Sequence, residues 1–100
     1  MFLARNQLSG SIPVKLGKLS ALTYLNLCEN ELTGSIPEEL GKLSVLETLM
    51  LNTNQLSGPI PEVLGQLKAL TRLALSYNRN LTLQAAEKRL PNLTPSFEPL

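Results

Sequence analysis

The chain has 100 residues, of which 43% are hydrophobic and only 4% aromatic, and its formal net charge is +1. This length allows one domain, whose core must be built mainly from leucine. The nine Lys and Arg residues are scattered among eight acidic ones, which leaves no basic stripe or aromatic platform of the kind that binds nucleic acid.

Residue types that support catalysis are missing. Histidine and aspartate are both absent, so Ser-His-Asp and Cys-His nucleophiles and histidine-containing metal sites are excluded. The adjacent Glu38 and Glu39 are interpreted as a solvated surface, and the single Cys28 has no partner for an internal disulfide. We therefore expect no enzyme activity, no cofactor and no metal site.

Targeting signals are also missing from the printed residues. The first twenty residues do not form an apolar secretory segment, and no run of eighteen apolar residues occurs. Direct membrane insertion is not expected, and the chain as written predicts a cytoplasmic location. An extracellular or cell-membrane location would follow if the chain is part of a receptor.

A period of 24 residues organises the sequence. Asparagine, glycine, an Ile-Pro pair and several leucines each recur at this spacing. Such a period predicts a solenoid, in which each unit buries its apolar face against its neighbours. The asparagines of this period are Asn6, Asn30, Asn54 and Asn78.

In chain order, the first element is a partial coil. Leu3 takes the place of Leu27, and Asn6 takes that of Asn30, so the chain enters at the end of a strand. We interpret this beginning as a cut edge within a longer binding surface.

A short strand is predicted next, around Leu25 and Leu27, because inward leucines alternate there with outward residues. Its equivalents in later coils would stack as one parallel sheet. Each asparagine of the period then ends its strand, where a buried amide can satisfy backbone groups at the turn. These four residues are predicted to form a structural ladder.

The segment "GSIPEELGKL" predicts a helical turn on the opposite side. The fixed φ of Pro37 suits its first position, and Gly41 suits a left-handed end. After Asn78 the pattern degenerates, so residues 1–83 are assigned to repeats, 84–93 to a capping turn or helix, and 94–100 to a loose tail. Asn80 and Asn92 each begin a glycosylation acceptor triplet.

The unit L-x-x-L-x-x-L-x-L-x-x-N-x-L-x-G-x-I-P-x-x-L-G-x, read at Leu19–Lys42 and Leu43–Gln66, resembles the plant-type leucine-rich repeat. This resemblance implies an α/β solenoid: a right-handed superhelix with a short concave parallel sheet and 3-10 or irregular turns on the convex side. Known members include ectodomains of plant receptor-like kinases and receptor-like proteins.

The outward strand positions are the predicted ligand surface, because the scaffold does not constrain them. They form four columns, to which Ala4, Arg5, Cys28, Glu29, Thr53 and Ala74 also belong. The residues expected to bind a ligand are Tyr24, Asn26, Thr48, Met50, Asn52, Arg72, Ser76 and Tyr77.

The leading hypothesis is a non-enzymatic module that binds a protein or peptide through this sheet, as a part of a longer receptor or defence-type protein. Two alternatives remain open. The chain could be the regulatory repeat segment of a larger intracellular kinase or GTPase, or a truncated product with no independent role.

Overall fold

Three short parallel strands form one side of the molecule in the computed structural model, which describes residues 1–78 and 80–82. They are β2 (Tyr24–Asn26), β4 (Thr48–Met50) and β6 (Arg72–Ala74), and they form a sheet in the order β2-β4-β6, which we call the first sheet. Leu25 pairs with Leu49 and Leu49 with Leu73, so the register follows the 24-residue period. Phe2 adds a parallel bridge to Asn26 at the outer edge of β2.

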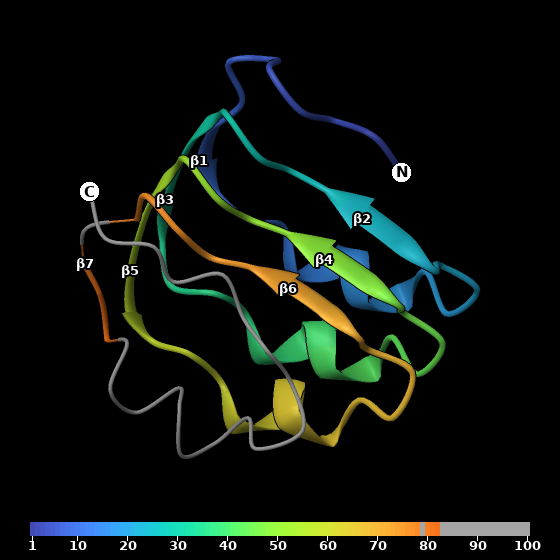
Figure 1. Cartoon of the computed structure of the whole chain (residues 1–100). Helices are drawn as coiled ribbons and strands as arrows, with labels where there is room; N and C mark the ends of the chain where they lie inside the picture. Colours follow the sequence, from blue (N-terminus) through green and yellow to red (C-terminus); the bar gives the residue numbers. More distant parts are fainter. Residues whose placement is uncertain (79, 83–100) are drawn as a thin grey trace.

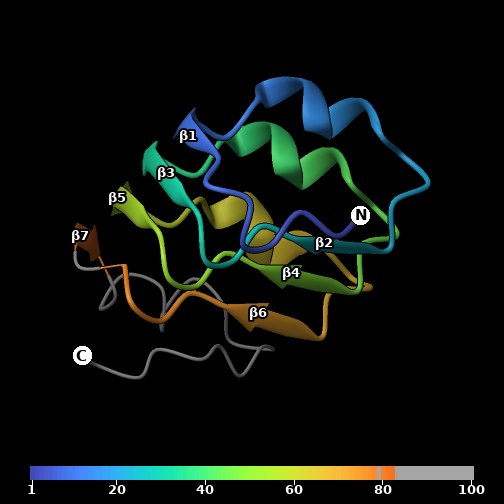
Figure 2. The ribbon, with the colours of Figure 1, turned by 90° about the horizontal axis from the view of Figure 1, so that it is seen from above.

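A second parallel sheet, which is not among the elements predicted from the sequence, forms another side of each coil. Its strands are β1 (Ser9–Ser11), β3 (Glu31–Gly34), β5 (Gln55–Pro59) and β7 (Asn80–Thr82), in the order β1-β3-β5-β7. Figures 1 and 2 show the two stacks of strands on different sides of the same coils. The expected solenoid is therefore confirmed, with one sheet more than predicted.

The third side consists of 3-10 helices, as expected. They are η1 (Val14–Lys18), η2 (Glu38–Lys42) and η3 (Glu62–Gln66). In η2 the amide of Leu40 donates to the Pro37 carbonyl at 3.3 Å, which is the i to i+3 bond of such a helix. Pro37 lies just before the helix in an extended conformation (φ −71°, ψ 141°), one position earlier than predicted.

Leucine and isoleucine side chains fill the space between the three sides. Eleven large side chains are less than 2% exposed, and every coil after the partial first one contributes some of them. Their burial follows the period: Leu25, Leu49 and Leu73 lie inward from the first sheet, while Leu40 and Leu64 lie inward from the helices. A single continuous core thus runs along the stack and makes neighbouring coils depend on one another. The predicted cap (84–93) and tail (94–100) lie outside the described residues.

Glycines in the helices allow neighbouring coils to approach closely. This role differs from the left-handed helix end that was predicted for Gly41. Gly41 has no positive φ. A Cβ added to Gly17 would lie 2.5 Å from the backbone oxygen of Glu39, and one added to Gly41 would lie 2.7 Å from Cβ of Val63. The left-handed glycine of each coil is instead the one in the second sheet, as at Gly34 with φ +78°.

The asparagines of the period bond each coil to the one before it. Asn54 Nδ2 donates to the carbonyl of Leu27 in the preceding coil (3.0 Å) and to that of Leu51 in its own (3.1 Å). Its Oδ1 accepts from the amide of Leu32 at 3.1 Å. Asn30 and Asn78 are also buried and make the same kind of bonds.

Asn6 differs from the prediction of a buried ladder residue. It is exposed, and its side chain makes no hydrogen bond with the described residues. Among the described residues no carbonyl of a preceding coil corresponds to the one that Leu27 offers to Asn54, and the Leu3 carbonyl of its own coil accepts from Asn30. Only the backbone amide of Asn6 joins the ladder, by donating to Asn30 Oδ1 at 2.9 Å.

The residue before each ladder asparagine adopts a left-handed conformation. Arg5, Glu29, Thr53 and Tyr77 all have φ between 55° and 61°. This geometry is costly for a β-branched side chain, so Thr53 is the strained member of the column. Its amide donates to the Ser76 carbonyl at 2.9 Å, which keeps the conformation in place.

We expect Thr53→Asn to raise the free energy of unfolding by about 1 kcal/mol, because asparagine tolerates the left-handed region better than threonine. Urea denaturation of the two proteins would measure the difference. Thr33→Asn, at a strand position with negative φ, is the matched control and should not stabilise. A lower midpoint for Thr53→Asn than for the parent would contradict the assigned strain.

Candidate functional site

One of the four predicted columns of outward side chains, which we call the row, crosses the first sheet near the start of its strands. Tyr24 pairs with Thr48, and Thr48 with Arg72. Tyr24 and Arg72 are exposed and Thr48 is half-buried. All three predicted positions are therefore open to a ligand and lie in one line across the strands.

An aromatic pair stands at one end of this row. The rings of Phe2 and Tyr24 are stacked, with centroids 6.4 Å apart and an angle of 11° between their planes. The Tyr24 hydroxyl accepts from Asn26 Nδ2 at 3.0 Å and approaches Met50 Sδ at 3.9 Å. These contacts hold the tyrosine ring over the next strand positions.

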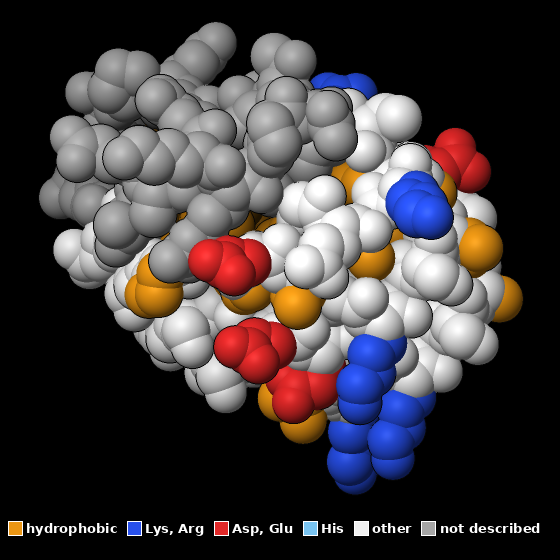
Figure 3. Space-filling view, turned by 90° about the horizontal axis from the view of Figure 1, so that it is seen from below, with side chains coloured by type: hydrophobic (Ala, Val, Ile, Leu, Met, Phe, Trp, Pro, Cys, Tyr) orange, Lys and Arg blue, Asp and Glu red, His pale blue; other side chains and the backbone are white. Residues whose placement is uncertain are grey.

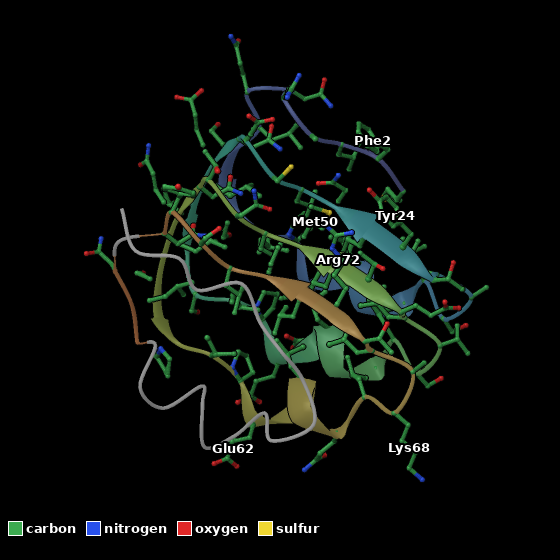
Figure 4. The ribbon with its side chains drawn as sticks, viewed as in Figure 1. Phe2, Tyr24, Met50, Glu62, Lys68 and Arg72 are labelled. Atoms are coloured by element: carbon green, nitrogen blue, oxygen red, sulfur yellow. The ribbon has the colours of Figure 1, made fainter. Side chains whose placement is uncertain are left out.

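Phe2, Tyr24, Met50 and Arg72 form what we call the aromatic–arginine patch. Figure 4 shows the four side chains near one another over β2, β4 and β6. Phe2 is 69% exposed and Tyr24 36%, while Met50 is half-buried. Large aromatic side chains, methionine and arginine are typical of residues that anchor protein interfaces.

Asn26 was expected to face a ligand, and the structure corrects this expectation. It is only 4% exposed. Its amide side chain is used internally, since Oδ1 accepts from the Cys28 amide at 3.1 Å while Nδ2 bonds to Tyr24. Its backbone amide donates to the Met1 carbonyl at 3.0 Å, so the first residues close over its edge. Asn26 positions Tyr24 and is not itself a contact surface.

The column further along the strands is also more closed than expected. Cys28 is 8% exposed, and burial raises the pKa of its thiol, so it is a small core residue and not a reactive surface group. Asn52 and Ser76 are half-buried. Asn52 Oδ1 is buried and has no hydrogen-bond donor within the described part of the chain.

Tyr77 lies apart from the patch. It is 43% exposed and follows β6 in the left-handed column. No ring contact or hydrogen bond joins it to Tyr24 or Met50 among residues 1–78. In the same column, Arg5 Nε pairs with Glu29, but both side chains are well exposed, and such ion pairs contribute little to stability.

A shallow groove of about 860 Å³ lies on another face, between the second sheet and the helices. Its lining contains serine, proline, valine and the carboxylates of Glu38, Glu39 and Glu62, but no aromatic residue. Figure 3 shows this face, where acidic side chains gather beside a cluster of basic ones. The groove therefore lacks the anchors that the aromatic–arginine patch provides.

Two general findings limit the chemistry of the described residues. They hold no group of three or more His, Cys, Asp or Glu side chains placed to bind a metal ion. Within the same residues, no helix has the length and apolar character needed to span a bilayer.

Asn80, the first of the two glycosylation acceptors, is exposed on β7, and Asn92 lies outside the described residues.

Phe2 is a site residue that sequence reasoning missed. The signal was available, because the equivalence of Leu3 with Leu27 places Phe2 opposite Asn26. The structure forms that pairing as a bridge. What the sequence could not give is the stacking of Phe2 on Tyr24, which depends on how both rings turn over the edge of the sheet.

Comparison with known proteins identifies relatives of the whole arrangement. A sequence model of the family described as Leucine rich repeat matches residues 21–79. The ectodomain of GASSHO1/SCHENGEN3 from Arabidopsis thaliana, solved with CASPARIAN STRIP INTEGRITY FACTOR 2, is 46% identical with a TM-score of 0.77; the alignment covers 81% of this chain and 10% of that one. No curated protein matches the chain significantly.

Two further structures are similar. In the complex of PEPR1 with AtPEP1, the matched chain is 42% identical with a TM-score of 0.84, over 99% of this chain and 14% of that one. In the Arabidopsis thaliana BIR3–SERK2 complex, the values are 42% and 0.77, over 80% of this chain and 43% of that one. The chain thus spans less than half the length of each of these relatives.

Proposed function

Because this chain belongs to the leucine-rich repeat family, a non-enzymatic class of protein-interaction module, we propose that it binds a peptide or protein through the first sheet. The observation that carries the proposal is the aromatic–arginine patch. It brings two stacked rings, a thioether and a guanidinium together on one open face.

The relatives support this assignment at the level of class. GASSHO1/SCHENGEN3 is the ectodomain of a plant membrane receptor kinase. Similar structures also include a plant peptide hormone receptor in complex with RGF2, and a receptor kinase in complex with a peptide hormone and a co-receptor. We infer from them that this chain is part of a receptor-type protein and that this module acts outside the cell or at its membrane. Among the three hypotheses drawn from the sequence, these relatives favour the first over a segment of an intracellular enzyme.

The binding proposal can be tested with a phage-displayed library of random twelve-residue peptides panned on the immobilised protein. Peptides recovered on the parent protein should bind Met50→Glu at least about tenfold more weakly, since the carboxylate would sit beside the Tyr24 ring in a desolvated contact. Fluorescence anisotropy of labelled peptides would measure the affinities.

Val45→Glu is the matched control, because Val45 is an exposed apolar residue (42%) in the turn before β4 and outside the patch. It should bind the recovered peptides as the parent does. Circular dichroism would verify that both variants are folded. Equal affinities for Met50→Glu and the parent, or no recovered peptide at all, would refute the first sheet as the binding surface.

A further inference from the structure

We propose that the ligand of the aromatic–arginine patch is a polyproline II segment that carries an apolar side chain and an acidic side chain three residues apart. This inference rests on the proposed function and specifies the chemistry of its partner. It follows from three features of the patch: its spacing, its rigid aromatic end and its single free cation.

The spacing comes from the strand register. Tyr24 and Arg72 stand on β2 and β6 in the same row, with β4 between them. Two strand spacings amount to roughly 9.6 Å. A polyproline II helix rises about 3.1 Å per residue and repeats its side-chain direction every third residue, which gives about 9.3 Å. In a flat β-strand, side chains on one face are about 6.7 or 13.4 Å apart, and neither value fits.

The aromatic end is pre-arranged for an apolar group. Tyr24 is fixed by Asn26 Nδ2 at 3.0 Å and by the Phe2 ring, which itself remains 69% exposed. A ring held in this way loses little conformational freedom when it receives a ligand. Flat aromatic surfaces of this kind dock polyproline II segments, whose conformation is also preformed.

The other end selects for negative charge. Arg72 is exposed, and its guanidinium makes no ion pair with any side chain in residues 1–78 or 80–82. Thr48, which separates it from Tyr24 in the row, is uncharged. A carboxylate can therefore form a charge-assisted pair with Arg72 without displacing a resident acid.

The backbone of the sheet favours the same ligand. β4 is paired on both sides, and β2 is paired with β4 and bridged to Phe2. A ligand that crosses these strands cannot join the sheet by backbone hydrogen bonds. Polyproline II has no hydrogen bonds of its own to satisfy and is recognised mainly through its side chains.

An array of acetylated and amidated decapeptides would test the inference. Each peptide carries one Phe at position i and one Glu at a position from i+1 to i+6, in either a proline-rich or a glycine-rich background. The separation is the difference between the two positions. Blocked ends remove terminal charges from the comparison. Binding should peak at a separation of three in the proline-rich set, and Glu→Gln in that peptide should weaken it about two- to fivefold.

Arg72→Glu provides the charge reversal, and it should prefer the peptide in which Lys replaces Glu. Lys68→Glu is the matched control, since Lys68 is an exposed cation of the same coil that lies before the start of β6, away from the patch (Figure 4). It should keep the parent's preference for Glu.

The outcomes separate this inference from the proposed function. If binding is lost in Met50→Glu but shows no optimum at three residues, or no reversal in Arg72→Glu, the polyproline II inference is wrong and the binding surface stands. If Met50→Glu binds the array as the parent does, the binding surface itself is wrong.

Discussion

Replacing Asn54 with alanine is expected to lower the free energy of unfolding by about 3 kcal/mol. The substitution removes hydrogen bonds to the Leu32 amide and to the carbonyls of Leu27 and Leu51. Asn54 is 8% exposed, so water cannot readily replace its amide, and each buried group left unpaired costs about 1 to 3 kcal/mol. Urea denaturation followed by circular dichroism would measure the loss.

Thr48→Ala is the control for this prediction. Thr48 lies on the same coil but is half-buried on the outer row, and its side chain makes no hydrogen bond with a described residue. Its truncation should change the free energy of unfolding by about 0.5 kcal/mol or less. Similar denaturation midpoints for the two variants would show that the ladder does not stabilise the stack as argued.

Asn54, which recurs in every coil, and Thr48, which does not, also show which parts of the fold could be predicted from the sequence. The repeat shows the same residue type at every coil wherever the surroundings repeat, as with Leu25, Leu49 and Leu73. The second sheet escaped prediction because its strands contain serine and glycine without an alternating apolar pattern. Their pairing comes from the stacking of coils that the ladder already holds together.

The site was less predictable, because exposure in a sheet depends on neighbours that the period does not define. Tyr24 and Arg72 face outward as expected. Asn26 is buried because the tyrosine in its own strand turns over it and Met1 bonds to its backbone. A column that is open by alternation can therefore be closed by the size of the side chain two residues away.

Gly17→Ala is expected to destabilise the protein by about 3 kcal/mol, as strongly as loss of the ladder amide. The added Cβ would lie 2.5 Å from the backbone oxygen of Glu39 in the next coil. Helices η1 and η2, and the two coils that contain them, would have to separate. Overpacking of this kind costs about 1 to 3 kcal/mol. Thermal and urea denaturation would both report the change.

Gly41→Ala gives the comparison that identifies the cause. Its added Cβ would lie 2.7 Å from Cβ and 2.8 Å from Cγ2 of Val63, which are side-chain atoms. The second substitution Val63→Gly should therefore recover part of the stability lost in Gly41→Ala, which a double-mutant cycle would measure as a coupling energy of about 1 to 2 kcal/mol.

Glu39→Gly should give a smaller recovery in Gly17→Ala. It removes the Glu39 Cβ, at 3.0 Å, but the backbone oxygen, at 2.5 Å, makes the closest contact and remains. A large coupling between positions 17 and 39 would mean that the Glu39 side chain, and not its backbone oxygen, is the obstruction. A Gly17→Ala variant as stable as the parent would mean that the coils can move apart at little cost. The distance between coils would then be set by the sheets and the ladder, and the repeated glycine of the helices would have no part in fixing the stack.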